Sequence, residues 1–147
     1  MKDRFEKEVV SILPESIKIV ELPPGEKHQY NCFAYALDLH DDIEPFKDGF
    51  VYSSFVKYLL DKNELEKISE MPQKGDIVLY WNGNDLKHAG KVIDGDIVIS
   101  KWSGGPLLEH SLLHVPVEYG DRIEYYRILS VSKIKQTLEQ HKELNQP

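Results

Sequence analysis

The sequence is poor in the residues that cross-link or anchor small proteins. Its 147 residues include a single cysteine, Cys32, so an intramolecular disulfide and a four-cysteine zinc site are both excluded. No uninterrupted apolar run approaches the length of a membrane span, and the first residues lack the apolar core of a secretory signal. We therefore expect a cytoplasmic protein with no membrane partner, or an effector that is exported by a non-classical route.

Positive charge is also in short supply. The 18 basic residues against 25 acidic ones leave a net charge of −7 with neutral histidines. A net negative charge does not attract the phosphate groups of a nucleic-acid backbone, so nucleic acid is not an expected partner. No glycine-rich phosphate loop is present, and His110 and His114, four residues apart, lack a third metal ligand. We expect neither a metal nor another cofactor.

The remaining composition is that of one globular domain. Hydrophobic residues make up 41% of the chain and charged residues 29%, and a domain of this length can bury a core without covalent cross-links. No repeat or linker divides the chain. We predict one domain over residues 1–147, with a core at about 28–129 and a surface helix at 131–144.

Helical periodicity comes first along the chain and strand periodicity follows. Helices are predicted over 2–13, 31–37 and 50–61, and an extended segment over 14–29 has apolar residues that can edge a sheet. Strands are predicted over 77–81, 88–93, 97–102, 107–117 and 122–129. This order predicts the α+β class, with N-terminal helices packed on one face of an antiparallel sheet.

Cys32 is the first candidate for chemistry, because it begins the predicted buried helix. Asn31 precedes it and is a suitable N-cap. A helix N-terminus carries unsatisfied N–H groups and partial positive charge, which favour a thiolate and can receive an oxyanion. The alternative is that Cys32 is a small buried hydrophobe in the core.

His88 is the second candidate. It opens a predicted strand, and the small residues Ala89 and Gly90 leave room for a backbone or a ligand to approach. A histidine in this place can serve as the general base that a thiol nucleophile needs. The alternative is a strand-edge histidine that is hydrogen-bonded to a neighbouring loop.

Three short motifs occur in a characteristic order over residues 28–115. Cys32 opens the apolar helix, Gly75-Asp76 precedes a strand, and His88-Ala89-Gly90 opens the next strand. Together they resemble the permuted papain-like thiol hydrolases, the group of NlpC-type peptidases and CHAP amidases. The resemblance implies a papain-like core, Cys32 as nucleophile, His88 as base, and a peptide or amide substrate that can be part of a protein.

The third member of a triad is where the sequence departs from that group. An ungapped match places Ser100 at its position, and a serine orients an imidazole without supplying charge. A three-residue hairpin loop puts Gly90 opposite Ser100, whereas a two-residue loop puts Lys101 opposite His88, where a cation would depress imidazole basicity. His110, after a flexible loop, is the alternative third member.

Substrate contacts are predicted on both sides of the nucleophile. Gln29, Tyr30 and Asn31 are candidates for the oxyanion or substrate site, and Trp102 is a candidate contact surface. We predict a cysteine-dependent hydrolase or acyl transferase that acts on an amide or peptide bond. The alternatives are a non-catalytic papain-like binding module and a deamidase of the toxin or effector type.

Overall fold

The computed structural model describes residues 17–21, 31–39, 51–101, 106–120 and 122–144. Within these ranges, no helix combines the length and the apolar character needed to cross a membrane. The predicted helix over 2–13 lies outside them.

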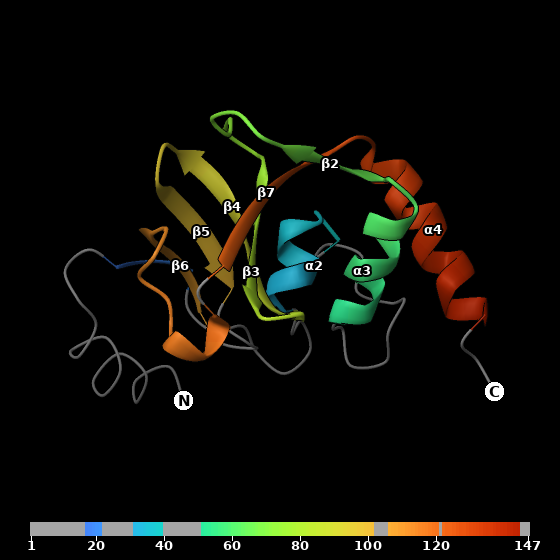
Figure 1. The fold of residues 1–147 in the computed structure, drawn as a ribbon, viewed down its shortest axis with the longest axis horizontal. Helices are drawn as coiled ribbons and strands as arrows, with labels where there is room; N and C mark the ends of the chain where they lie inside the picture. Colours follow the sequence, from blue (N-terminus) through green and yellow to red (C-terminus); the bar gives the residue numbers. More distant parts are fainter. Residues whose placement is uncertain (1–16, 22–30, 40–50, 102–105, 121, 145–147) are drawn as a thin grey trace.

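A seven-stranded antiparallel sheet makes up most of the described structure (Figure 1). Its spatial order is β1-β6-β5-β4-β3-β7-β2, so β4 and β3 are central and short strands form the two edges. The strands are β1 (Lys18–Glu21), β2 (Leu65–Ile68), β3 (Ile77–Asn82), β4 (Asp85–Asp94), β5 (Ile97–Lys101), β6 (Leu107–Ser111) and β7 (Arg122–Ile128).

The two faces of the sheet are covered by different elements (Figure 1). On one face, a large apolar cluster joins β3 and β4 to the helices α2 (Cys32–Ala36), α3 (Ser53–Asp61) and α4 (Val131–Leu144). On the other face, a smaller cluster around Tyr80 includes partly buried residues of the connection between β6 and β7, among them Tyr119 of the 3-10 turn η4 (Val117–Tyr119). Strand β4 is therefore enclosed between two layers.

The predicted fold, N-terminal helices on a sheet in a papain-like core, is wrong. The described residues form mainly a sheet, with three α-helices, of which α2 has only five residues. Strand β1 precedes these helices, and α4 follows the last strand. The face that carries the helices is thus built from separate parts of the chain, because burial of an apolar stripe depends on tertiary contact and not on sequence order.

Local backbone signals explain why α2 and α3 are short. Asp38 and Asn63 take the left-handed conformation, with φ of 59° and 57°. The next N–H in each case bonds back five residues, from Leu39 to Ala34 O and from Glu64 to Leu59 O. This is the Schellman arrangement, which satisfies the last carbonyls of a helix and ends it.

Strand predictions were more successful than the predicted fold. The extended segment contains β1, which lies at one edge of the sheet as expected, and the predicted runs at 77–81 and 122–129 correspond to β3 and β7. Strand β2 was missed, and β4 begins at Asp85, three residues before the predicted start. In α4, the predicted surface helix, Ile134 and Leu138 are fully buried.

The β4–β5 hairpin has the loop length of one predicted alternative, two residues, and the strand register of the other, the three-residue loop. A two-residue loop that contains Gly95 closes it, but a bulge just before the loop shifts the register. Beyond the bulge the strands follow the register expected for a three-residue loop, and a Cβ on Gly90 would lie 3.2 Å from the Cβ of Ser100. Because side chains alternate along a strand, Lys101 lies on the sheet face opposite to that of His88.

Gly120 holds the turn η4 against the end of β3. Its φ is +101°, and a Cβ added there would overlap the backbone carbonyl of Trp81. Only glycine therefore allows this close approach, which places Tyr119 over the sheet.

We predict that Gly120→Ala destabilises the protein more than Gly75→Ala does. Gly75 has a similar φ of +93°, but an added Cβ would meet no other atom there. Its substitution should therefore cost only the backbone strain of a positive φ, which lowers the free energy of unfolding by roughly 1–3 kcal/mol. The overlap at Gly120 adds to that strain, and we expect a total loss above roughly 3 kcal/mol. Urea unfolding of both variants measures the difference, and equal losses would show that the close approach is not required.

Candidate functional site

Asn31 caps the helix that carries Cys32, as predicted. Its Oδ1 accepts the backbone N–H of Ala34 at 3.0 Å, and the same side chain bonds Val51 through both its amide and its carbonyl oxygen, at 2.6 and 3.2 Å. The cap therefore also fixes the segment before α3. The bond to Val51 O uses one of the two N–H groups of the Asn31 amide, so an oxyanion role for this residue stays a prediction.

The thiol of Cys32 is buried and neutral. Burial raises its pKa to about 12, although the backbone amides of Ala89, Phe33 and Cys32 itself approach the sulfur and act in the opposite direction. A thiolate was predicted from the helix N-terminus, but desolvation outweighs the partial charge of a five-residue helix. The sulfur nevertheless lies against the backbone of β4, at the residue next to His88.

His88 lies in an aromatic slot on the other face of β4. It pairs with Tyr80 across the ladder, and its ring stacks on Tyr119 with centroids 4.3 Å apart and an angle of 18°. Only 1% of the residue is exposed, and among the described residues its Nε2 has no hydrogen-bond partner. A buried polar atom without a partner is uncommon in proteins and calls for an explanation.

The imidazole of His88 is neutral at physiological pH. Burial lowers its pKa to about 3, and the nearby His110 contributes in the same direction. Both effects disfavour imidazolium, since neither water nor an anion stabilises the added charge. The structure thus holds a neutral thiol and a neutral imidazole, and not an ion pair.

Tyr119 interacts with His88 directly and with Cys32 electrostatically. Burial, and after it the charge of a Cys32 thiolate, raise the pKa of Tyr119 to about 12, so the sulfur and the phenol are within electrostatic reach. The same ring stacks on His88. Tyr119 therefore stacks on one predicted catalytic residue and lies within electrostatic reach of the other, and no hydrogen bond joins Cys32 to His88 in the described structure.

Ser100 and His110, the two candidates for a third triad member, bond to one another. Ser100 Oγ lies 2.6 Å from His110 Nε2, and His110 Nδ1 lies 2.8 Å from the carbonyl oxygen of Ser111. A carbonyl only accepts, so Nδ1 carries the proton and Nε2 accepts the Ser100 hydroxyl. Burial lowers the pKa of His110, in keeping with this neutral tautomer.

Gln29, Tyr30 and Trp102 lie outside the described residues. The sequence analysis did not identify Tyr80 and Tyr119 as neighbours of His88. Tyr80 contacts His88 because the register of β3 and β4 pairs the two residues. Tyr119 contacts it from the turn η4, which is 31 residues away in the sequence. Gly120, next to Tyr119, is the only local signal that this turn makes a close contact.

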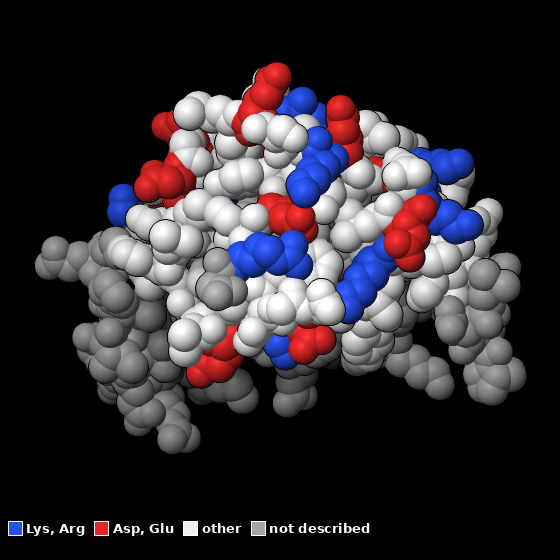
Figure 2. All heavy atoms as spheres, in the orientation of Figure 1, with Lys and Arg blue, Asp and Glu red and all other residues white. Residues whose placement is uncertain are grey.

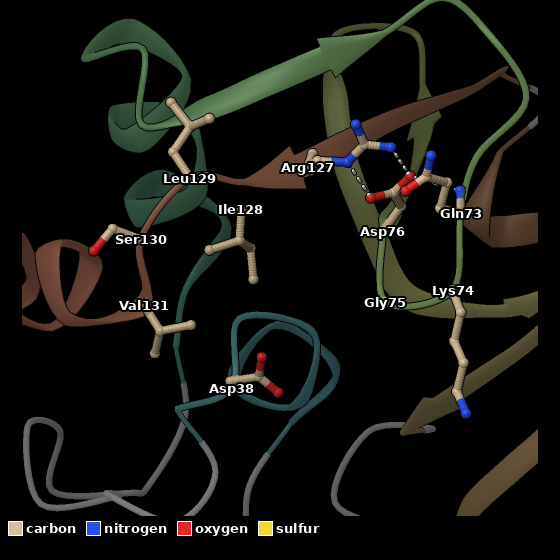
Figure 3. A pocket seen from close by; sticks show the side chains of 10 residues that line it. All are labelled: Asp38, Gln73, Lys74, Gly75, Asp76, Arg127, Ile128, Leu129, Ser130 and Val131. Carbon is tan, nitrogen blue, oxygen red and sulfur yellow. Dashed lines mark hydrogen bonds and ion pairs between the residues drawn. The ribbon is translucent and has the colours of Figure 1, made fainter.

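A groove with a volume of about 440 Å³ lies elsewhere, between the turn before β3 and the start of α4 (Figure 3). Arg127 donates two hydrogen bonds to Asp76 on its wall, both of 2.9 Å, and these lower the pKa of Asp76. Asp38, also on the wall, pairs with Lys91. The ionic groups of the groove thus largely neutralise one another, and none of the predicted site residues lines it.

The charged surface offers no simple guide to a ligand. On the face drawn in Figure 2, acidic and basic side chains are intermixed. In the described part of the chain, no three His, Cys, Asp or Glu side chains gather as they would around a metal ion.

Comparison with known proteins identifies a family. A family model for a domain of unknown function, DUF7689, matches residues 23–127. The chain belongs to the DUF7689 family. No curated protein and no solved structure matches it. The DUF7689 match contains Cys32, His88, Ser100, His110 and Tyr119, whereas α4 lies beyond it.

We predict that His88 makes this DUF7689 domain less stable in acid. An unfolded histidine binds a proton near pH 6.5, whereas folded His88 binds it only near pH 3. Between these values the unfolded chain holds the extra proton, so the free energy of unfolding falls by about 1.4 kcal/mol per pH unit on account of this residue.

The variant His88→Phe tests this linkage because it retains an aromatic ring but cannot titrate. Urea unfolding at several pH values between roughly 6 and 4 should give a shallower pH dependence for the variant than for the wild type. Parallel curves for the two proteins would mean that His88 is not desolvated as described.

Proposed function

We propose that this DUF7689 domain is a cysteine-dependent hydrolase or acyl transferase for an amide or peptide bond, with Cys32 as nucleophile and His88 as base. The proposal is carried by the Nε2 atom of His88, which is buried, lacks a partner among the described residues and belongs to the residue next to the Cys32 contact at Ala89. A buried imidazole nitrogen without a partner, one residue along the strand from a contact with a buried thiol, is a candidate to receive a proton during reaction.

The reaction would proceed through a thioester. As Sγ of Cys32 bonds to the substrate carbonyl carbon, the thiol proton passes to Nε2 of His88 and the carbonyl oxygen becomes an oxyanion. The carbon–nitrogen bond then breaks, and the imidazolium returns the proton to the leaving amine. Water, or another acceptor nucleophile, attacks the thioester and loses its proton through His88, which releases the acyl product and restores the thiol.

The neutral resting state determines how the proton moves. With pKa values of about 12 for Cys32 and about 3 for His88, a stable thiolate–imidazolium pair does not form before substrate binds. Proton transfer therefore accompanies formation of the sulfur–carbon bond, and the charges arise only as the carbonyl is attacked.

A second function, a non-catalytic binding domain, is favoured by the same burial. Desolvation of Cys32 and His88 opposes the charge separation that catalysis needs, and inert buried cysteines are common in cores. In either case the expected partner is a peptide or protein and not nucleic acid, and a cytoplasmic location remains part of the proposal.

The decisive experiment is acylation of the folded protein by p-nitrophenyl acetate, an activated acyl donor. We expect a burst of p-nitrophenolate release as Cys32 is acylated, followed by slower turnover as water attacks the thioester, which mass spectrometry of peptides locates on Cys32. Cys32→Ala should abolish the thioester, and both His88→Ala and His88→Phe should slow its formation roughly 10²- to 10⁴-fold, because general-base assistance is lost.

A matched control is His141→Ala. His141 lies on α4 and packs against Phe55 and Tyr58, so this variant removes an imidazole away from β4 and should acylate at the wild-type rate. If the wild-type protein forms no thioester, or forms it equally fast without His88, the enzyme hypothesis fails and the binding domain is the better description.

A further inference from the structure

The orientation of the His88 ring requires a physical cause. In a Cys–His catalytic pair, a third group normally holds the imidazole in place through a hydrogen bond. Among the described residues, no hydrogen bond reaches Nε2 of His88 or its other ring nitrogen, Nδ1, which an orienting group would bind. Ser100 Oγ and both ring nitrogens of His110 make contacts with each other and with Ser111. The sequence-predicted third members therefore do not bond His88.

Aromatic rings enclose the imidazole instead. Tyr119 lies nearly parallel to it, with centroids 4.3 Å apart and an interplanar angle of 18°, and Tyr80 packs at 5.4 Å and 48°. Stacked and tilted arrangements of this kind are the preferred geometries of ring pairs. Two rings at different angles leave the imidazole little freedom to rotate about χ2.

The backbone around Tyr119 is itself constrained. Its N–H bonds Pro116 O at 3.0 Å, and the N–H of Gly120 bonds Val117 O at 3.1 Å. Gly120 is pressed against the carbonyl of Trp81 with no space for a Cβ. The turn η4 therefore presents the Tyr119 ring from a defined position, as a side chain must if it is to orient another group.

We propose that Tyr119 is the positioning residue of the site, and that its stacked ring orients His88 in place of a hydrogen-bonded third triad member. This inference rests on the proposed function, because that function gives His88 a catalytic role. The stacking of Tyr119 on His88 does not depend on it. The electrostatic link between Cys32 and Tyr119 is consistent with it. The phenol hydroxyl plays no part in the proposed role, and the aromatic face is the essential feature.

The test compares Tyr119→Phe, which keeps the ring, with Tyr119→Leu and Tyr119→Ala, which remove it. The first readout is NMR of the His88 ring protons, assigned by their loss in His88→Phe. We expect Tyr119→Phe to preserve their shifts and both ring-less variants to move them and broaden them. Leu113→Ala is the control, because Leu113 lies in the same connection but is 74% exposed.

The second readout is the rate of Cys32 acylation by p-nitrophenyl acetate. Tyr119→Phe and Leu113→Ala should stay within about twofold of the wild type, and Tyr119→Leu and Tyr119→Ala should be slower by roughly 10- to 100-fold, as expected when a catalytic group is misplaced. In a His88→Phe background the loss of the Tyr119 ring should have no further effect, since Tyr119 acts through His88.

The two proposals fail in different ways. If ring-less variants that remain folded by circular dichroism leave the His88 resonances unchanged, or slow acylation equally without His88, the positioning role is wrong. If the resonances respond to the ring but acylation never depends on His88, Tyr119 does orient His88 and the proposed enzyme function is the part that fails. Should Tyr119→Ala not fold, Tyr119→Leu decides, because it retains more apolar volume.

Discussion

Enclosure of strand β4 on both faces is the constraint on which the candidate site depends. Side chains on a strand alternate between faces, so Ala89 meets the start of α2 while His88 meets η4. The two layers that cover β4 remove water from Cys32 on one side and from His88 on the other. Every unusual property of the site, including the raised pKa of the thiol and the lowered pKa of the imidazole, follows from this double coverage.

Burial at β4 keeps both candidate groups in their uncharged forms. Isolated charges in a low-dielectric interior are costly, and neutralisation of the group is the usual outcome. The Ser100–His110 pair shows the same principle, since two neutral groups satisfy each other through one short hydrogen bond. Any chemistry at this site must create charge transiently, and a binding function would avoid creating it at all.

Local structure was predictable where local forces decide it. The apolar run of β3, the cap at Asn31 and the turn at Gly95 all depend on residues close together in the sequence. The predicted helix at 31–37 agrees with α2 and its two cap residues, and the left-handed conformation of Asp38 explains why it ends there. The fold class failed because which helix covers which face depends on contacts between distant segments.

Residue types and their spacing were enough to name the components of the candidate site, which are one thiol at a helix start and a histidine followed by two small residues, in a chain with an excess of acidic charge. The tertiary structure alone decided the partners: Ser100 with His110, Tyr119 with His88, and the carbonyl of Trp81 with Gly120. It also decided the direction of each pKa shift. A residue's type sets its ordinary pKa, but desolvation depends on what covers it, and that is known only once strands and turns far apart in the chain are packed together.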